Sequence, residues 1–481
     1  MEKDYSKYFT PSINQARKRL GAEVKTIIYE LRDEYQNLGK GLKYYVKTYG
    51  CQGNLSDTEK IAGILEQMKF VFASEEKDAD LVLFNTCAIR ENAENRVFGE
   101  LGRIQRLKRQ KPNMIIGVCG CMPQEEKTMS MLKKRFPHIN LVFGTHNIID
   151  LPSYLYDVLV NEKSVIDVLS IEGHIAEMIP TKRDHERKAW VNIMYGCDEF
   201  CTYCIVPYTR GKERSRSPKA IINEVKMLID LGYLEVTLLG QNVNAYGKDL
   251  EGLNYTFPDL LKDLHKLPIK RIRFTTSHPR DFDDRTIEAM ALGGNIMPHL
   301  HLPVQSGNNR ILQKMNRKYS REEYVEKMTK LKQKVPGISI TTDIIVAFPS
   351  ETASEYEDTL SLVEEVGFEG AYTFIFSPRE GTPASKYANE LTEEEKKERL
   401  YKLNNLVNQY SYQGNLRFEG QIVNVLVEGP SKSKNNILTG YSEHNKLVNF
   451  SGDESLIGQI VPIKITKAYT WHLAGELVYE S

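Results

Sequence analysis

Three cysteines on one short stretch carry the clearest chemistry in the sequence. Cys197, Cys201 and Cys204 follow one another at the spacing C-x-x-x-C-x-x-C. Thiolate sulfur is a soft ligand that selects iron–sulfur clusters, zinc or copper(I). Three thiolates on one tight loop hold three irons of a cubane cluster and leave the fourth iron open to a small molecule. A structural zinc site usually has four ligands, and no second cysteine pair or close histidine follows, so zinc is the weaker interpretation.

Three other cysteines lie just past the ends of separate predicted strands. Cys51, Cys87 and Cys121 each follow an apolar run, and amphipathic helices separate these runs. Alternating strands and helices predict a parallel sheet covered on both faces, in a Rossmann/flavodoxin-like α/β domain. Ligands of such sheets gather at the carboxyl ends of the strands, so we expect these three thiolates to hold a second cluster. The strands are predicted at 44–46, 81–84, 114–118 and 141–143, and the helices at about 56–68, 91–109 and 124–135.

The seventh cysteine, Cys119, lies at the end of the strand that precedes Cys121. We expect Cys119 in the core of the domain, and the alternative is that it substitutes as a ligand. The number of cysteines is odd, and three of them form a metal-binding loop. The sequence therefore predicts a reducing compartment and no disulfide framework.

The elements that position these cysteines belong to a chain of 481 residues, long enough for two to four domains. Its 41% hydrophobic and 27% charged residues are typical of a soluble globular protein. Lys+Arg and Asp+Glu balance at 64 each, so any nucleic acid must be bound by local patches. We find no membrane-length apolar run and no signal peptide, and we expect a cytoplasmic protein with no membrane partner.

Four segments are predicted along the chain. Residues 1–41 are expected to form a charged helical extension, because apolar residues recur at helical spacing from Leu20 to Leu31. Residues 42–165 form the α/β domain described above. In 183–412, six strand–helix units predict a partial (β/α)6 barrel, with the 197–204 loop at its mouth, where barrel chemistry gathers. Residues 415–478 contain short strands and close turns, which predict a small β-barrel.

The loop spacing, with Tyr203 before the third cysteine, resembles the signature of the radical S-adenosylmethionine (SAM) enzymes. In that superfamily the open iron binds the amino and carboxylate groups of SAM. The reduced cluster then cleaves SAM to methionine and a 5′-deoxyadenosyl radical. The resemblance therefore implies a 4Fe-4S cluster and SAM as cofactors.

A more specific resemblance extends over 42–478. The motifs at 49–54, 85–90 and 120–124 are similar to the amino-terminal domain of the methylthiotransferases, which are radical SAM enzymes with two 4Fe-4S clusters. The stretch 194–211 is similar to the MiaB-type branch, which acts on tRNA. Residues 415–478 resemble the TRAM module, an RNA-binding barrel. The sequence departs from the family at Ala347 and Ser350, where family members often carry glycine.

The resemblance also implies residues that bind SAM. The strand-end motif 240–242 would meet the methionine moiety, and a second group would lie near the ribose or adenine. The alternative is that the glycines and prolines of these motifs only shape turns. The implied SAM-binding residues are Tyr203, Gly240, Gln241, Asn242, Gln305, Ser306 and Asp343.

Two features suggest contacts with RNA. The segment 210–216 has four basic residues, among them Arg210, Arg214 and Arg216, which could neutralise phosphates or the negative charge of a cluster. The alternative is an ordinary segment leading into a helix. In the C-terminal module, Tyr441 and Trp471 are expected to stack on bases.

We therefore predict a tRNA methylthiotransferase. The family's substrate would be N6-isopentenyladenosine next to the anticodon, converted to its 2-methylthio derivative, with one SAM as the radical source and one as the methyl donor. The C2–H bond of adenine is strong and not acidic, so its activation needs a cofactor. The expected partners are tRNA and an electron donor such as flavodoxin or ferredoxin, and a monomer is expected.

Other functions are also compatible with the sequence. The same architecture could methylthiolate threonylcarbamoyl-adenosine in tRNA or a ribosomal protein, although the stretch 195–211 disfavours both. The chain could also be an iron–sulfur RNA-binding protein without turnover.

Overall fold

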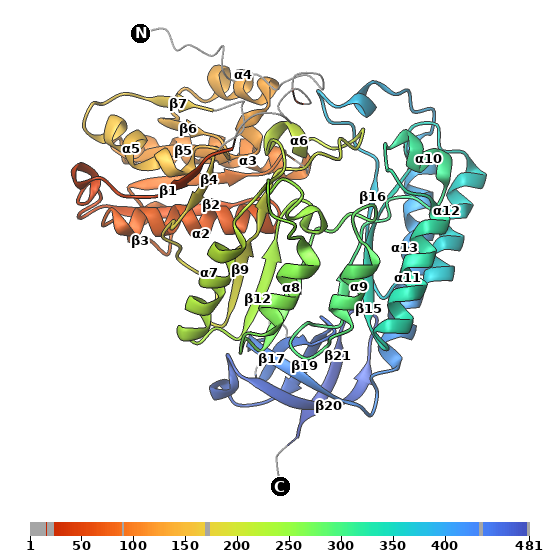
Figure 1. Cartoon of the computed structure of the whole chain (residues 1–481). Helices are drawn as coiled ribbons and strands as arrows, with labels where there is room; N and C mark the ends of the chain where they lie inside the picture. The colour runs from red at the N-terminus through yellow and green to blue at the C-terminus, as the bar shows by residue number, and fades with distance from the viewer. Residues whose placement is uncertain (1–15, 17–23, 89–90, 169–173, 432–435, 479–481) are drawn as a thin grey trace.

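The computed structural model describes residues 16, 24–88, 91–168, 174–431 and 436–478 of the chain. The described residues form an N-terminal α/β domain, a central barrel of parallel strands and a small C-terminal β-barrel (Figure 1). The α/β domain lies beside the upper part of the central barrel, and the C-terminal barrel lies below the central barrel (Figure 1).

The N-terminal domain is built on a six-stranded parallel sheet in the order β3-β2-β4-β5-β6-β7. Two apolar clusters cover it: one includes Ile61 of helix α2 and Leu155 of α5, and the other includes Leu101 of α3 and Leu132 of α4. The predicted sheet with helices on both faces is confirmed. The short strands β3 and β7 at its edges were not predicted. The strands are β2 (Lys43–Thr48), β3 (Val71–Phe72), β4 (Leu81–Thr86), β5 (Ile115–Gly120), β6 (Leu141–Phe143) and β7 (Val165–Asp167), and the helices are α2 (Gln52–Gln67), α3 (Glu91–Gln110), α4 (Glu126–Arg135) and α5 (Leu151–Leu159).

The N-terminal extension differs from the prediction where it is described. Residues 24–31 contain strand β1 (Thr26–Ile28), which pairs in parallel with β8 (Ile175–Glu177), and a 3-10 turn follows at Asp33–Tyr35. The predicted helix is wrong here, because the β-branched run Thr26-Ile27-Ile28 favours an extended backbone and finds a partner strand far along the chain. The part of the predicted helix at 1–15 and 17–23 lies outside the described residues.

The central barrel contains six parallel strands. Sheets β9-β12-β13 and β14-β15-β16 are linked by a parallel bridge between Ile272 and Ile296. In the described structure β9 and β16 do not pair with each other, so the barrel is open on that side, and the prediction of a partial barrel is confirmed. The strands are β9 (Lys188–Asn192), β12 (Glu235–Leu239), β13 (Arg271–Phe274), β14 (His299–His301), β15 (Ser339–Val346) and β16 (Ala371–Ile375).

Helices cover the outside of this barrel and share one large apolar core with its strands. Several begin with a capping box: the side chains of Ser320, Thr352 and Thr392 each accept a hydrogen bond from the backbone three residues later. The helices are α7 (Pro218–Asp230), α8 (Phe257–His265), α9 (Asp284–Met290), α10 (Asn309–Lys314), α11 (Arg321–Lys334), α12 (Ala353–Val366) and α13 (Glu393–Leu416). The short helix α6 (Val206–Thr209) and the ribbon of β10 (Met194–Tyr195) and β11 (Arg214–Ser215) flank the 197–204 loop.

The C-terminal module is a closed five-stranded barrel in the order β17-β18-β19-β21-β20. The predicted β-barrel is confirmed, and β21, which was not predicted, closes it. Its strands are β17 (Ile422–Pro430), β18 (Ile437–Ser442), β19 (Leu447–Ser451), β20 (Ile460–Ala468) and β21 (Leu473–Leu477). It is attached to the amino end of the central strands, because Arg271 and Arg273 of β13 donate to the carbonyl oxygens of Tyr441 and Ser442 at 2.9 and 2.7 Å.

Two turn residues adopt a backbone conformation that favours glycine. Ala347 has φ of 56° and Ser350 has φ of 68°. These are the two positions at which the sequence departs from the family's glycines. The turn therefore keeps a left-handed backbone at both positions, at some cost in strain for residues that carry a Cβ.

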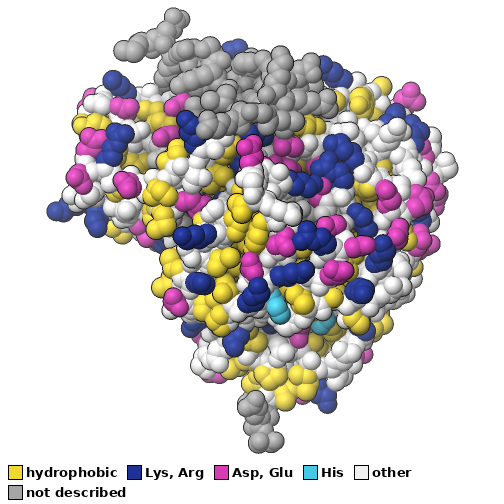
Figure 2. All heavy atoms as spheres, viewed as in Figure 1, with side chains coloured by type: hydrophobic (Ala, Val, Ile, Leu, Met, Phe, Trp, Pro, Cys, Tyr) yellow, Lys and Arg dark blue, Asp and Glu magenta, His cyan; other side chains and the backbone are white. Residues whose placement is uncertain are grey.

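The charge balance of the sequence is visible on the surface. Figure 2 shows lysine and arginine side chains interspersed with aspartate and glutamate over the face turned to the viewer. Among the described residues, no helix is both long and apolar enough to span a membrane.

Candidate functional site

Neighbouring strands bring the three cysteines of the N-terminal domain together. Cys51, Cys87 and Cys121 follow β2, β4 and β5, which are adjacent in the sheet. The loops are joined by backbone hydrogen bonds, from Tyr49 to Asn85 O and from Cys121 to Thr86 O, both 2.8 Å long. The thiol of Cys87 hydrogen-bonds the sulfur of Cys51. We call these residues the strand trio.

Glycine allows the loops of the strand trio to approach so closely. A Cβ on Gly50 would lie 2.7 Å from the Cβ of Cys87, and one on Gly120 would lie 2.3 Å from the carbonyl oxygen of Thr86. Both glycines also have positive φ, 147° and 96°. Any larger residue at either position would push the cysteine loops apart.

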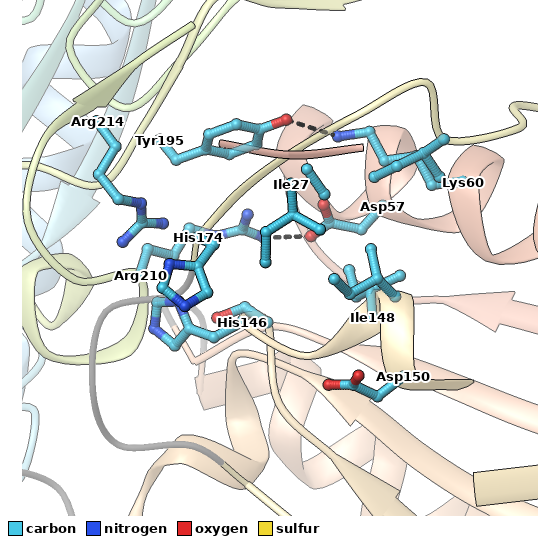
Figure 3. Close-up of a pocket in the computed structure, with 14 residues that line it drawn as sticks. Ile27, Asp57, Lys60, His146, Ile148, Asp150, His174, Tyr195, Arg210 and Arg214 are labelled. Atoms are coloured by element: carbon cyan, nitrogen blue, oxygen red, sulfur yellow. Dashed lines mark hydrogen bonds and ion pairs between the residues drawn. The ribbon is translucent and has the colours of Figure 1, made fainter. Parts of the chain in front are cut away.

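Arg210 of the central domain reaches the strand trio. Its Nε lies 3.3 Å from Cys121 Sγ, and its Nη2 donates to Asp57 Oδ2 at 2.7 Å, as Figure 3 shows for the second contact. The hydrogen bond from Cys87, followed by the charge of Arg210 and nearby backbone amides, lowers the pKa of Cys51 to about 5. Burial raises the pKa of Cys121 in spite of the same arginine.

The cysteines at 197, 201 and 204, which we call the loop trio, lie on one tight turn. The Cys204 amide donates to Cys201 O at 3.0 Å, and the Cys197 amide donates to Gly211 O at 3.1 Å. Arg317 Nη1 lies 3.4 Å from Cys201 Sγ. Burial, together with the neighbouring sulfurs, raises the pKa of Cys197 and raises that of Cys204 to about 12.

The two trios lie close to each other across the domain junction. Cys121 belongs to a buried apolar cluster with Phe200, Ile205 and Tyr208, which come from the 197–204 loop and the residues after it. A cavity of about 850 Å³ inside the open barrel is lined by Cys51 and Cys121, among other residues. The structure thus brings three thiols from each domain to one region of the molecule.

The residues expected to bind SAM are distributed around this region. Gly240 and Gln241 line the cavity, and Gln241 Oε1 accepts a hydrogen bond from the Gly196 amide, next to the loop trio, at 2.6 Å. Asn242 is buried and donates to Asp281 Oδ2 at 2.6 Å. Asn242 Oδ1 and Gln305 Oε1 are buried without a hydrogen-bond partner among the described residues, which suits the binding of a polar ligand.

The other expected SAM contacts have clear protein partners. Tyr203 packs edge-on against Phe348 with ring centroids 6.5 Å apart. Ser306 is fully buried, with its hydroxyl 3.5 Å from that of Thr359 on α12. Asp343 lines the cavity and lies 3.4 Å from His301 Nε2. Ser306 is therefore placed to hold helix α12, while Asp343 is accessible from the cavity.

The three arginines expected to contact RNA are buried, which corrects that prediction. Arg210 binds Asp57 and Cys121, as described above. Arg216 is held by Glu177 and by Glu224, at 2.6 Å from the latter. Arg214 packs over the ring of Tyr195 and lines the small junction pocket of Figure 3. A run of basic residues predicted an exposed patch, but the fold encloses it between two domains.

The two aromatic residues expected to stack on RNA have different environments. Trp471 is 76% exposed, and its indole NH donates to Asn408 of α13 at 3.2 Å. Tyr441 is half-buried and lines the barrel cavity, with Lys188 over its ring. Of the two, only Trp471 lies on the outer surface. Cys119 belongs to β5 and is fully buried in the core, as expected.

Sequence reasoning missed a buried polar group behind the loop trio. Glu199, His278 and Asp281 each place a side-chain donor atom within 4.8 Å of the others. Arg280 forms ion pairs with both carboxylates, and burial, with Arg317 nearby, lowers the pKa of His278. Lys248 forms a further ion pair with Asp281, so basic side chains already pair with both carboxylates. No spacing in the sequence indicates the group, because Glu199 comes from the 197–204 loop whereas His278 and Asp281 come from the loop between β13 and α9.

Sequence profiles match three parts of the chain. The radical SAM superfamily matches residues 191–363, and the TRAM domain matches residues 416–478. A profile described as uncharacterized protein family UPF0004 matches residues 43–144, the part that carries the strand trio.

Curated relatives match the chain over its whole length. Proteins of Bacillus cereus and Bacillus cytotoxicus named tRNA-2-methylthio-N(6)-dimethylallyladenosine synthase are each 55% identical to it over 485 residues. The match covers 100% of this chain and 95% of each relative.

Solved structures show a related fold at much lower identity. The radical SAM methyltransferase TsrM of Kitasatospora setae, with tryptophan and a SAM analogue bound, has a TM-score of 0.52 and 13% identity, covering 71% of this chain and 75% of that one. The same enzyme with cobalamin and a [4Fe-4S] cluster has a TM-score of 0.52 and 14% identity, covering 72% and 77%.

Proposed function

Because the chain belongs to the family of tRNA-2-methylthio-N(6)-dimethylallyladenosine synthases, we propose that it converts N6-dimethylallyladenosine (isopentenyladenosine) in tRNA to its 2-methylthio derivative. It is a radical SAM tRNA methylthiotransferase. The target is the adenosine next to the anticodon. One SAM is the source of the radical and another donates the methyl group.

The chemistry of the target explains the need for a radical. The C2–H bond of adenine is not acidic, so no side chain in the cavity could remove this hydrogen as a proton. The loop trio would hold a 4Fe-4S cluster, which with SAM would supply the radical chemistry that such a bond needs. Three thiols on one turn fit a cluster with one iron left for SAM, and the unpartnered Asn242 and Gln305 oxygens nearby suit a polar cofactor.

We propose that the strand trio holds a second 4Fe-4S cluster, which serves the sulfur and methyl transfer. Its three sulfurs at one sheet edge are suitable donors for such a cluster. Arg210 and Arg317 each place a guanidinium beside one sulfur, in Cys121 and Cys201. A cation beside each trio offsets the negative charge of a thiolate-bound cluster.

The observation that carries the proposal is the packing of the two trios across the domain junction. Phe200 of the loop trio's turn, and Ile205 and Tyr208 just after it, share one buried cluster with Cys121 of the strand trio, and both domains line one cavity. A reaction that needs a radical and a sulfur atom at the same base requires such proximity. Neither an RNA-binding protein without turnover nor a single-cluster enzyme would need it.

Further features of the proposed function rest on the sequence. We propose that the enzyme acts in the cytoplasm as a monomer. It would receive electrons from a low-potential carrier such as flavodoxin or ferredoxin, because the radical source must be reduced before each cleavage of SAM.

The decisive experiment is anaerobic and has two readouts. Purified, reconstituted enzyme is analysed for iron and sulfide, then incubated with SAM, a reductant and tRNA carrying dimethylallyladenosine. Mass spectrometry of the tRNA nucleosides should show the 2-methylthio product, with 5′-deoxyadenosine released. Release of 5′-deoxyadenosine with unchanged tRNA would contradict the proposed substrate, and no release would contradict radical chemistry.

A further inference from the structure

Strand β16 presents two large aromatic side chains to the barrel cavity. Tyr372 and Phe374 are 64% and 40% exposed, although both line this enclosed space. They are two residues apart, so they lie on the same face of the strand. Exposed aromatic pairs in a concave site commonly mark a binding surface. We call the two residues the aromatic ledge.

The ledge lies at the open side of the barrel. β16 and β9 are the two edge strands, and they do not pair with each other in the described structure (Figure 1). Trp190 of β9 lines the same cavity from the opposite edge. A planar group entering between the edge strands would therefore meet aromatic side chains on both sides.

A histidine ring packs against the tyrosine of the ledge. The rings of His301 and Tyr372 meet edge to face with centroids 5.9 Å apart. His301 is itself positioned by Thr341 Oγ1, 3.0 Å from Nδ1, and by Asp343 Oδ1, 3.4 Å from Nε2. Hydrogen-bonding groups therefore lie next to the tyrosine of the ledge.

The described lining of the cavity offers no free lysine or arginine. Among the described residues that line it there are three such cations, and each is paired with a carboxylate. The pairs are Lys188 with Glu428, Arg210 with Asp57 at 2.7 Å, and Arg273 with Glu235 at 3.0 Å.

We propose that the aromatic ledge stacks the target adenine and that the cavity wall selects its N6 substituent. An apolar, uncharged substituent such as dimethylallyl lies against the aromatic rings, and burial of its carbons favours binding. A substituent with a carboxylate, such as threonylcarbamoyl, is disfavoured because the wall has no free lysine or arginine to neutralise it. This inference rests on the proposed function and names the residues that set its specificity.

The test is RNA binding without reductant, so that no turnover occurs. Dissociation constants are measured anaerobically for synthetic anticodon stem-loops with adenosine, dimethylallyladenosine or threonylcarbamoyladenosine at the target position. Tyr372→Ala and Phe374→Ala should each weaken binding of the dimethylallyl stem-loop by about tenfold, as for the loss of a base–aromatic stack. Tyr372→Phe retains the ring, so it should bind the dimethylallyl stem-loop almost as tightly as wild-type enzyme. Wild-type enzyme should bind the threonylcarbamoyl stem-loop more weakly than the dimethylallyl one.

The matched control is Tyr401→Ala, which removes a tyrosine of similar exposure (70%) from α13. It should leave all three dissociation constants unchanged. If the ledge variants bind and discriminate the three stem-loops as wild-type enzyme does, the inference is overturned. The proposed function is tested separately, by measuring the 2-methylthio product formed by wild-type enzyme. Absence of that product would contradict the proposed function and not the inference about the ledge.

A second variant addresses the charge argument. Glu428→Gln removes the partner of Lys188 and leaves a free cation in the cavity wall. The variant should bind the threonylcarbamoyl stem-loop more tightly than wild-type enzyme does. The preference for the dimethylallyl over the threonylcarbamoyl stem-loop should therefore fall by a few-fold. An unchanged preference would refute the role of cation pairing in selection.

Discussion

The strand trio and the loop trio carry the same donor atoms but are assembled differently. Cys197, Cys201 and Cys204 lie on one short loop, residues 197–204, in which the Cys204 amide donates to Cys201 O. Cys51, Cys87 and Cys121 come from three strands and are brought together only when β2, β4 and β5 pair. The loop trio therefore depends on local geometry, whereas the strand trio depends on the whole sheet.

The electrostatic surroundings of the two trios also differ. The pKa of Cys51 is lowered to about 5, chiefly by the hydrogen bond from Cys87 and then by Arg210. The pKa of Cys204 is raised to about 12 by burial and by Cys201. The comparison indicates that Cys51 of the strand trio is a thiolate before any metal binds, whereas Cys197 and Cys204 of the loop trio must lose their protons when a metal centre binds.

Loss of a loop-trio ligand should have the largest effect. Cys201→Ala should abolish both 5′-deoxyadenosine release and the methylthio product, because all radical chemistry starts at this trio. Anaerobic single-turnover assays with chromatography of 5′-deoxyadenosine would measure both. Any substantial release by the variant would show that the loop trio is not the radical site.

Loss of a strand-trio ligand should separate the cleavage of SAM from the transfer of the methylthio group. Cys51→Ala should abolish the methylthio product but still permit cleavage of SAM, because the loop trio remains intact. The same assays apply, with iron analysis to show that one cluster remains. Full product formation by Cys51→Ala would contradict the sulfur-carrying role of the strand trio.

Removal of the arginine beside the strand trio should destabilise the domain junction. Arg210→Met leaves Asp57 buried without its ion-pair partner, which should lower the free energy of unfolding by about 3–5 kcal/mol. Chemical denaturation followed by circular dichroism would measure the change. The double variant Asp57→Asn/Arg210→Met should regain part of the loss, and an equally unstable double variant would argue against the ion pair as the cause.

The smallest effect expected is a difference in thiol reactivity in the cluster-free protein. At pH 7 a cysteine with a pKa of about 5 is mostly thiolate, and one with a pKa of about 12 is almost entirely thiol. Iodoacetamide should therefore label Cys51 at least about tenfold faster than Cys204. Peptide mass spectrometry over time gives both rates, and equal rates would remove the electrostatic distinction.

Much of this architecture could be predicted because its signals are periodic. The alternation of apolar runs and amphipathic helices predicted the parallel sheet and the partial barrel, and most strand limits lie within a few residues of the prediction. The short strands β3 and β7 and the closing strand β21 were not predicted, because a run of two to five residues shows little periodicity. Strand β1 was predicted as helix, because its pairing with β8 is a tertiary contact.

The sequence by itself determined the ligand chemistry and the order of the domains. Cysteine spacing within the 197–204 loop is local, and the placement of Cys51, Cys87 and Cys121 after strands follows from the alternation of strands and helices. Only the tertiary structure determined which groups the arginines contact. Arg210 and Arg216 belong to a basic run that suggested RNA contacts, yet domain packing buries them against carboxylates and, for Arg210, against Cys121. Asp57 and Glu177 lie far from these arginines in sequence, so no local pattern could reveal those buried ion pairs.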